Sequence, residues 1–311
     1  MCNSRSAHAH TSRPEHVKQP TQIYRLKVGD ALITAISDGT LQLNAPKVLH
    51  GADTSVIEAY LERSFLAHDI ETSINVYLIE LDDRKMLVDT GAGEWFGVGV
   101  GGRMLENLKV AGVEPEQITD LLVTHTHADH TGGMVRRGER VFPNAVVHIA
   151  QADIDFFLDP NQANLDSYKR EEMPDIFDQI KQTMGPYAQA GQVRTFDRAT
   201  EVVPGVTATL HPGHTPGSAC YTLVSAGHTI VFIGDMVHVE AVQFSSPEVF
   251  IDYDVDGVEA AASRTAAFAD LAERRVLVAG PHIRYPGIGH IRAEGQGYAW
   301  VPEVFGDKQV D

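Results

Sequence analysis

The order of apolar and polar residues along the chain predicts strands that alternate with helices. Apolar runs of strand length lie at 118–123, 206–209, 219–224, 229–233 and 275–279. Two hairpins are predicted, one from 24–28 and 31–38 around Gly29-Asp30 and one from 74–80 and 85–89 around Asp82-Asp83. Helices are predicted at 104–111, around 152–158, at 175–184 and at 257–273. The pattern indicates an α/β fold in which two sheet halves pack together between helices.

The amino-terminal segment differs from the rest of the chain. Residues 1–20 are polar, contain Pro14 and Pro20, and lack the apolar segment of a signal peptide, so we expect a flexible lead-in. Residues 21–311 contain no solenoid repeat, no dividing linker and no apolar run of membrane-spanning length, which predicts a single domain. The start Met1-Cys2 would also suit an exported or lipidated protein whose leader has been removed, which leaves the compartment open.

Residues 125–130, His-Thr-His-Ala-Asp-His, concentrate metal-ligand side chains. They follow a predicted buried strand and precede two glycines, so we expect them in a loop at the carboxyl end of that strand. His125 and His127 can hold one ion, and Asp129 and His130 can hold a second. Imidazoles and a carboxylate suit Zn²⁺ and its transition-metal neighbours better than Ca²⁺ or Mg²⁺. A chance collection of polar residues is the alternative, but random loops rarely have this spacing.

Three more ligand-type side chains follow predicted strands, namely His214, Asp235 and His282. Because chemistry collects at the carboxyl ends of strands in layered α/β folds, we expect them beside residues 125–130. Asp235 could bridge two ions. Taken singly, His214 or His282 would be interpreted as a structural histidine. Together with the first cluster they indicate a metal centre.

The order H-x-H-x-D-H, His, Asp, His resembles the metallo-β-lactamase superfamily. The resemblance implies a four-layer αββα sandwich and two divalent transition-metal ions, Zn²⁺ in first place with Mn²⁺, Co²⁺ or Fe²⁺ as alternatives. The implied ligands are His125, His127 and His214 for one ion, and Asp129, His130 and His282 for the other, with Asp235 between them. Over residues 21 to 305 the chain also resembles the methyl parathion hydrolase branch, with its lactonase and arylesterase relatives, at 38–40, 88–92, 142–145, 213–217, 241–244 and 286–295.

The net charge and two sequence motifs, one present and one absent, argue against some classes of function. The net charge of −17 argues against a nucleic-acid partner, because phosphate backbones are bound through an excess of Lys and Arg. A literal G-x-G-x-x-G at 97–102 does not directly follow a strand, so we interpret it as a rim loop near the metals and not as a dinucleotide site. The chain has no G-x-S-x-G elbow, so the nucleophile should be water and not a serine.

The ligand set predicts metal-assisted hydrolysis. Two cations ~3.5–4 Å apart share a bridging water and lower its pKa from ~16 toward ~7, and one of them polarises the C=O or P=O of the substrate. Asp235, with the bridging hydroxide, is the predicted catalytic group. Asp89 and His290 are candidates for orienting a ligand imidazole, and ordinary hydrogen bonding in turns is the alternative for both.

The predicted substrate is a small neutral ester, above all a lactone or an aryl ester, with promiscuous hydrolysis of organophosphate triesters. The candidate pocket residues are Trp95, Phe96, Phe157, His238, Ile251 and Tyr253. In the phosphotriesterases that the chain resembles, the wall matching His238 and Tyr253 is largely aliphatic, so this more polar wall favours a flat lactone. A dedicated phosphotriesterase of the methyl parathion hydrolase type stays open, as does a metal-binding or redox protein on the same scaffold. A homodimer is expected from the relatives.

Overall fold

Two long antiparallel strands, β2 (Ala31–Asn44) and β4 (Asp69–Leu81), form the centre of one sheet. Both are buried on both faces over their central residues, where polar side chains such as Asp38, Ser73 and Asn75 are buried among apolar ones, so their sequences show no clear alternation. Each strand extends beyond the predicted runs at 31–38 and 74–80, because the polar residues beyond those runs also pair with each other.

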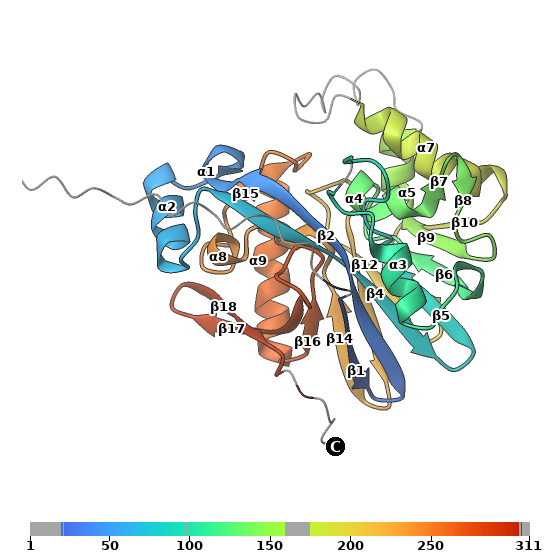
Figure 1. Cartoon of the computed structure of the whole chain (residues 1–311). Coiled ribbons are helices and arrows are strands. Elements are labelled where there is room, and N and C mark those ends of the chain that lie inside the picture. Colours follow the sequence, from blue (N-terminus) through green and yellow to red (C-terminus); the bar gives the residue numbers. More distant parts are fainter. Residues whose placement is uncertain (1–19, 21, 98, 159–174, 305, 307–311) are drawn as a thin grey trace, which may run out of the picture.

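The computed structural model describes residues 20, 22–97, 99–158, 175–304 and 306. The prediction of a flexible lead-in falls on residues 1–19, which lie outside the described residues. Within the described part of the chain, the strands form two seven-stranded sheets with helices on their outer faces (Figure 1).

The first sheet combines an antiparallel and a parallel half. Its order is β1 (Ile23–Val28), β2, β4, β5 (Arg84–Val88), β6 (Asp120–Leu122), β9 (Val146–Ala150) and β10 (Val193–Phe196). The strands from β5 to β10 run parallel to one another. Parallel neighbours need crossover connections, and helices α3 (Met104–Val110) and α7 (Ile176–Gln189) lie within two of them.

The second sheet contains the carboxyl-terminal strands. Its order is β11 (Thr200–Val203), β12 (Val206–Leu210), β13 (Ala219–Ser225), β14 (His228–Phe232), β16 (Leu277–Ala279), β17 (Ile288–Glu294) and β18 (Gly297–Pro302). β14 and β16 are parallel, and the long helix α9 (Gly257–Arg274) connects them.

Shorter elements lie at the ends of these sheets. The helices are α1 (Ala45–Val48), α2 (Thr54–Arg63), α4 (Ala128–Thr131), α5 (Gln151–Asp153) and α8 (Glu240–Gln243). The short strands are β3 (Leu49–His50), β7 (Val135–Arg136), β8 (Glu139–Arg140) and β15 (Phe250–Ile251). Single helical turns form η1 (Pro115–Gln117), η2 (Gly132–Met134), η3 (Ile154–Leu158) and η4 (Gly234–Met236).

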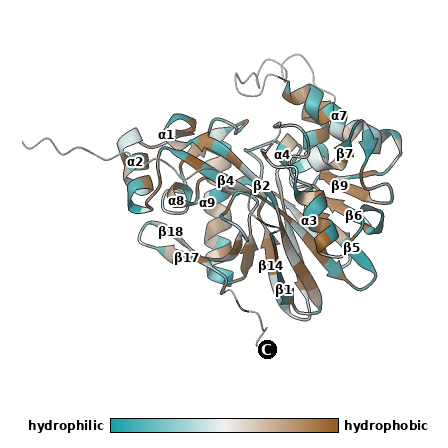
Figure 2. Ribbon diagram, in the orientation of Figure 1, coloured by the Kyte–Doolittle hydropathy of each residue, from teal (hydrophilic) through white to brown (hydrophobic). Residues whose placement is uncertain are grey.

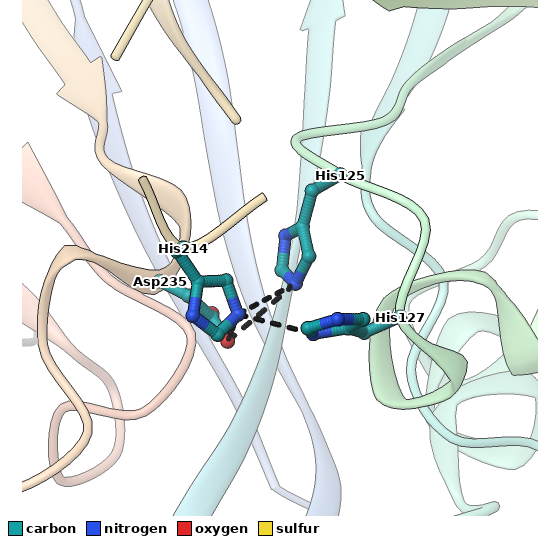
Figure 3. A group of neighbouring side chains, drawn as sticks. All are labelled: His125, His127, His214 and Asp235. Carbon is teal, nitrogen blue, oxygen red and sulfur yellow. Dashed lines mark hydrogen bonds and ion pairs between the residues drawn. The ribbon is translucent and has the colours of Figure 1, made fainter. Parts of the chain in front are cut away.

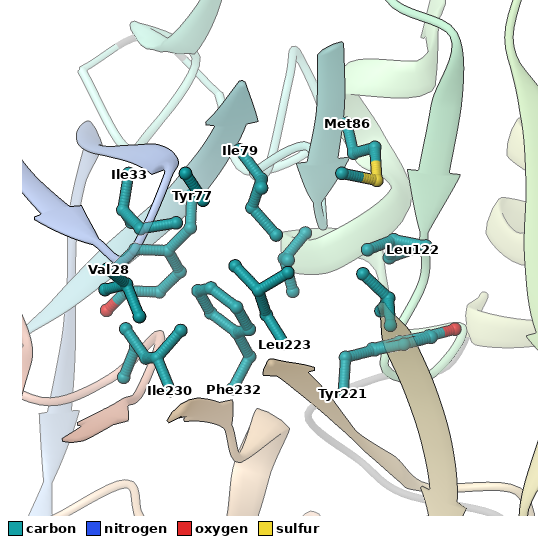
Figure 4. Packing of buried hydrophobic residues seen from close by; sticks show 14 of the residues in the cluster. Val28, Ile33, Tyr77, Ile79, Met86, Leu122, Tyr221, Leu223, Ile230 and Phe232 are labelled. Carbon is teal, nitrogen blue, oxygen red and sulfur yellow. The ribbon is translucent and has the colours of Figure 1, made fainter. Parts of the chain in front are cut away.

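Three hydrophobic clusters separate four layers. One cluster lies between the two sheets, where Tyr77 of β4 meets Phe232 of β14 with ring centroids 5.4 Å apart (Figure 4). A second cluster joins the first sheet to α3 and α7, and a third joins the second sheet to α9. Apolar residues follow the strands, whereas polar residues are common on the helices and loops (Figure 2). The predicted four-layer αββα sandwich is therefore confirmed.

Several element boundaries differ from the sequence prediction. The strand predicted at 275–279 begins only at Leu277, because Arg275 adopts a left-handed φ of 55° where α9 ends. Helix α7 continues past the predicted end at residue 184, with Pro186 inside it. The helix expected around 152–158 is a single turn, α5, followed by the π-helical turn η3. No described helix is long and apolar enough to cross a bilayer.

A buried carboxylate closes the loop that contains the G-x-G-x-x-G match. Asp38 of β2 accepts hydrogen bonds from the backbone N–H groups of Ala92 at 2.8 Å, Gly102 at 2.8 Å and Met104 at 2.7 Å. A Cβ at Gly101 would lie 2.8 Å from Asp38 Oδ2, so glycine is needed for the backbone to approach the carboxylate. These N–H groups therefore bind a carboxylate of the same chain, which gives Gly101 and Gly102 a structural role.

Replacing Asp38 with Asn should lower the free energy of unfolding by about 1–3 kcal/mol. Both carboxylate oxygens accept N–H groups, so an amide nitrogen would face a donor in either orientation. Urea denaturation measures the change, and Asp83→Asn in an exposed turn is the matched control. Equal denaturation midpoints for the two variants would show that Asp38 does not stabilise the loop.

Candidate metal centre

The predicted ligand residues come from loops that follow strands in both sheets. His125 and His127 lie between β6 and α4, and His214 follows β12. Asp235 follows β14, and His282 follows β16. The structure brings all of these residues together with Asp129 and His130 in two adjacent groups, each able to hold a metal ion.

The first group contains three imidazoles that face one point. His214 Nε2 lies 3.2 Å from His125 Nε2 and 3.0 Å from His127 Nδ1 (Figure 3). Asp235 Oδ2 lies 3.2 Å from the same His214 nitrogen. A tetrahedral ion with Zn–N bonds of ~2.0–2.1 Å would hold its ligand nitrogens about 3.3 Å apart, so these spacings fit one ion.

The second group shares Asp235 with the first. Asp235 Oδ1 lies 3.1 Å from His130 Nε2, and Asp235 Oδ2 lies 3.3 Å from His282 Nε2. Asp129 Oδ2 completes the group at 3.6 Å from His130 Nε2 and 3.3 Å from His282 Nε2. Asp235 thus contacts imidazoles of both groups, with Oδ2 beside His214 and His282 and Oδ1 beside His130, so it is the residue that the two groups share.

Buried polar atoms without partners support metal binding. His130 Nε2 and Asp235 Oδ1 are both buried and lie 3.1 Å apart, but they are not aligned as a hydrogen bond, and neither atom has another hydrogen-bond partner among the described residues. Leaving such atoms unpaired in the interior costs free energy, and a cation between them would remove that cost. The donor set of imidazoles and carboxylates fits transition-metal ions.

In three of the candidate ligand histidines, the second ring nitrogen hydrogen-bonds to a group behind the ring. His130 Nδ1 lies 2.9 Å from Asp89 Oδ2, His214 Nδ1 lies 2.7 Å from Asp254 Oδ1, and His282 Nδ1 donates to the carbonyl of Ser73 at 2.8 Å. Such contacts fix the ring orientation and leave Nε2 free for a metal ion. Asp89 therefore lies behind the imidazole of His130, the position that its predicted orienting role would require.

His290 is not in such a position, and that part of the prediction is wrong. Its Nδ1 bonds to the carbonyl of Val276 at 2.9 Å, and its Nε2 lies 3.6 Å from Glu303. The cause is its place within strand β17, which the sequence analysis did not predict. Asp254 was missed, because an acid shortly before α9 is typical of a helix cap, a role that Asp256 fills by accepting from Glu259 N.

Burial and the charges of neighbouring groups shift the pKa values of the candidate ligands. Burial and the nearby His130 lower the pKa of His125 well below its ordinary value, which keeps this imidazole neutral. Burial opposes ionisation of Asp235, but the imidazoles of His130 and His282 outweigh it and hold its pKa well below the usual range. Burial likewise opposes the charged form of His214, yet Asp235 and Asp254 raise its pKa to about 9. A bound metal ion would displace that proton.

Two aromatic side chains among the predicted pocket residues lie beside the ligands. His238 follows η4 and is buried, with Nε2 3.0 Å from Asp235 Oδ2 and its ring stacked on that of His282. It is therefore a direct neighbour of the ligands and not a hydrated rim residue. Phe157 is buried with its ring centroid 5.9 Å from that of His127.

The other predicted pocket residues differ in their environments. Tyr253 is partly buried, with its ring centroid 6.3 Å from that of His238. Ile251 is 1% exposed and belongs to a small core formed with α1, α2 and β3, so it is not an open wall. The side chain of Trp95 lies close to Gly132, just after α4, and Phe96 is 43% exposed.

Comparisons with known proteins agree with this geometry. The family model described as the metallo-beta-lactamase superfamily matches residues 69–282. An N-acyl homoserine lactonase from a Bacillus species is 29% identical over 159 residues, which is 45% of this chain and 54% of that protein. The N-acyl homoserine lactonase AiiA from Bacillus thuringiensis subsp. kurstaki is 27% identical over the same length. The chain thus spans about half the length of these curated relatives.

Two solved structures match nearly the whole chain. The hydrolase AbOPH in the beta lactamase superfamily is 35% identical, with a TM-score of 0.86 and coverage of 93% of this chain and 100% of that one. AidC, a dizinc quorum-quenching lactonase in complex with the product N-hexnoyl-L-homoserine, is 26% identical, with a TM-score of 0.84 and coverage of 92% and 99%.

The purified chain should contain about two transition-metal ions, as expected for a binuclear site. Removing them with a chelator should lower the melting temperature, because buried imidazoles and carboxylates would lose their partners. Asp235→Ala should bind less metal, since both groups share this residue. Elemental analysis and calorimetry measure these effects. Full metal content in Asp235→Ala would show that Asp235 does not bridge.

Proposed function

The chain belongs to the metallo-β-lactamase superfamily, and we propose that it is a binuclear metal-dependent hydrolase of small neutral esters, above all lactones and aryl esters. The observation that carries the proposal is Asp235, whose carboxylate contacts His214 of the first group and His130 and His282 of the second. Similarity to N-acyl homoserine lactonases and to a dizinc lactonase supports the lactone as substrate.

The residues of the site have different proposed roles. When bound, two divalent transition-metal ions, with Zn²⁺ as the first choice, supply a hydroxide at neutral pH and polarise the ester carbonyl. Asp235 sets the separation of the two ligand groups. Asp89 and Asp254 keep the imidazoles that they contact in a fixed orientation. Burial of the ligand side chains keeps bulk water away and strengthens electrostatic interactions inside.

We propose that His238 gives the pocket a polar wall. Its Nε2 hydrogen-bonds to Asp235 Oδ2, so the imidazole is held in place, while its buried Nδ1 has no hydrogen-bond partner among the described residues. An unpaired polar atom beside the ligand groups suits the oxygens of an ester better than an apolar ring. Phe157 and, at the rim, Trp95, Phe96 and Tyr253 are the proposed apolar walls.

Organophosphate triester hydrolysis is the second candidate activity. The segments resembling the methyl parathion hydrolase branch favour it, and a neutral triester would meet the same hydroxide. His238 weighs against it as the main activity. A purely metal-binding or redox role is less well supported, because the solved structures similar to the chain include a hydrolase and a dizinc lactonase. The homodimer and the absence of nucleic-acid binding stay predictions, the latter on the basis of the net charge of −17.

A substrate panel tests the proposed function. With zinc-loaded protein, kcat/KM should be higher for an aromatic lactone, an acyl-homoserine lactone and a phenyl ester than for methyl paraoxon. The reason is that a flat carbonyl fits beside the imidazole of His238, whereas a tetrahedral triester carries bulky alkoxy groups. A kcat/KM highest for methyl paraoxon would favour the phosphotriesterase, and no hydrolysis at full metal content would favour the non-enzymatic role.

Replacing His238 with Leu should raise kcat/KM for a nitrophenyl phosphotriester roughly tenfold, because an apolar wall would add ~1–2 kcal/mol of contact with the ring. The lactone should gain nothing. Both substrates are measured at equal metal occupancy, with His228→Leu as control, since His228 is exposed on β14. An unchanged ratio of the two efficiencies would show that His238 does not face the substrate.

A further inference from the structure

One fully buried carboxylate outside the ligand groups connects the two loops that hold the three-histidine group. Asp153 is the last residue of α5, follows strand β9 of the first sheet, and is 0% exposed. The sequence analysis gave it no role. Because an isolated buried carboxylate is costly, its hydrogen-bond partners show what it does.

On one side, Asp153 holds the loop of the first sheet. Its Oδ2 accepts a hydrogen bond from the backbone N–H of Thr126 at 3.0 Å and lies 3.3 Å from the hydroxyl of the same residue. Thr126 stands between His125 and His127, so fixing its backbone fixes the positions from which both imidazoles project.

On the other side, Asp153 holds the loop of the second sheet. Its Oδ1 accepts from the backbone N–H of Gly217 at 2.7 Å. Gly217 lies in the same loop as His214. A Cβ on Gly217 would lie 2.7 Å from both the backbone N and Oδ1 of Asp153, so this close approach requires glycine.

We propose that Asp153 is a positioning residue that sets the distance between His125 and His127 on one loop and His214 on the other. The facing nitrogens of these imidazoles lie only 3.0–3.2 Å apart although they come from different sheets. Hydrogen bonds to a carboxylate are stronger than those between neutral groups, so they can hold the two loops in register before a metal ion binds. The proposal rests on the metal-binding role in the proposed function.

Replacing the carboxylate of Asp153 with an amide tests the proposal. Asp153→Asn keeps the shape of the side chain, but its amide nitrogen would face the N–H of either Thr126 or Gly217, whichever way the amide turns. One of the two links is therefore lost. Gly217→Ala approaches the same contact from the opposite loop. Asp155→Asn, an identical change two residues along on an exposed side chain, is the matched control.

The test is a titration of the metal-free protein with Co²⁺. Visible absorption monitors the Co²⁺ coordination, and competition with a chromophoric chelator measures the affinity of each ion. In Asp153→Asn and Gly217→Ala, one of the two ions should bind roughly 10–100-fold more weakly, with a changed Co²⁺ spectrum, while the other ion keeps its affinity. Asp155→Asn should behave as wild type. Thr126→Val keeps both backbone donors to Asp153 and should show a smaller loss of affinity for the same ion. It provides the test if the other variants do not fold.

The outcomes separate this proposal from the proposed function. Wild-type affinity and spectrum in Asp153→Asn and Gly217→Ala would overturn the positioning role. Equal weakening of both ions, in proportion to a loss of melting temperature, would overturn it as well, because that is the signature of general destabilisation. If the wild-type protein itself binds no metal, that result contradicts the proposed function and not the contacts of Asp153.

Discussion

One buried carboxylate, Asp235, organises the centre of this molecule. Its oxygens lie within 3.0–3.6 Å of imidazoles from loops of both sheets, those of His125, His130, His214, His238 and His282. So many ionisable groups can share one buried volume only if their charges compensate. The rest of the architecture meets this constraint by bringing the loops after β6, β12, β14 and β16 to one place and by holding the imidazoles of His130, His214 and His282 with hydrogen bonds from behind.

The sandwich explains how residues far apart in sequence reach that place. Each sheet buries an apolar face against the other, so the two halves have a fixed relation that does not depend on the metal site. The remaining freedom lies in the loops, and buried acids restrict it. Asp38 closes the glycine loop, Asp254 holds His214, and Asp153 connects loops from the two sheets. A metal ion would thus meet ligands that are already in position, which reduces the cost of binding.

The sequence was sufficient to select candidate ligand residues that the structure brings together, but not the groups that hold them. His125 to His130 are close in sequence and follow an apolar strand, so spacing alone reveals them. The bond between Asp254 and His214 joins residues 40 positions apart, and the bond from Gly217 to Asp153 joins residues 64 apart. Such contacts depend on the packing of the two sheets, which no local pattern specifies. For the same reason His290 was misplaced, since its strand was recognised only in the structure.

The central claim is that one carboxylate is shared by two metal ions. A crystal of the zinc-loaded protein, with anomalous scattering measured at the zinc edge, tests it directly. The account predicts two peaks, one among His125, His127 and His214 and one among Asp129, His130 and His282, with Asp235 in contact with both. A single peak at full zinc occupancy, or two peaks of which only one touches Asp235, would contradict it.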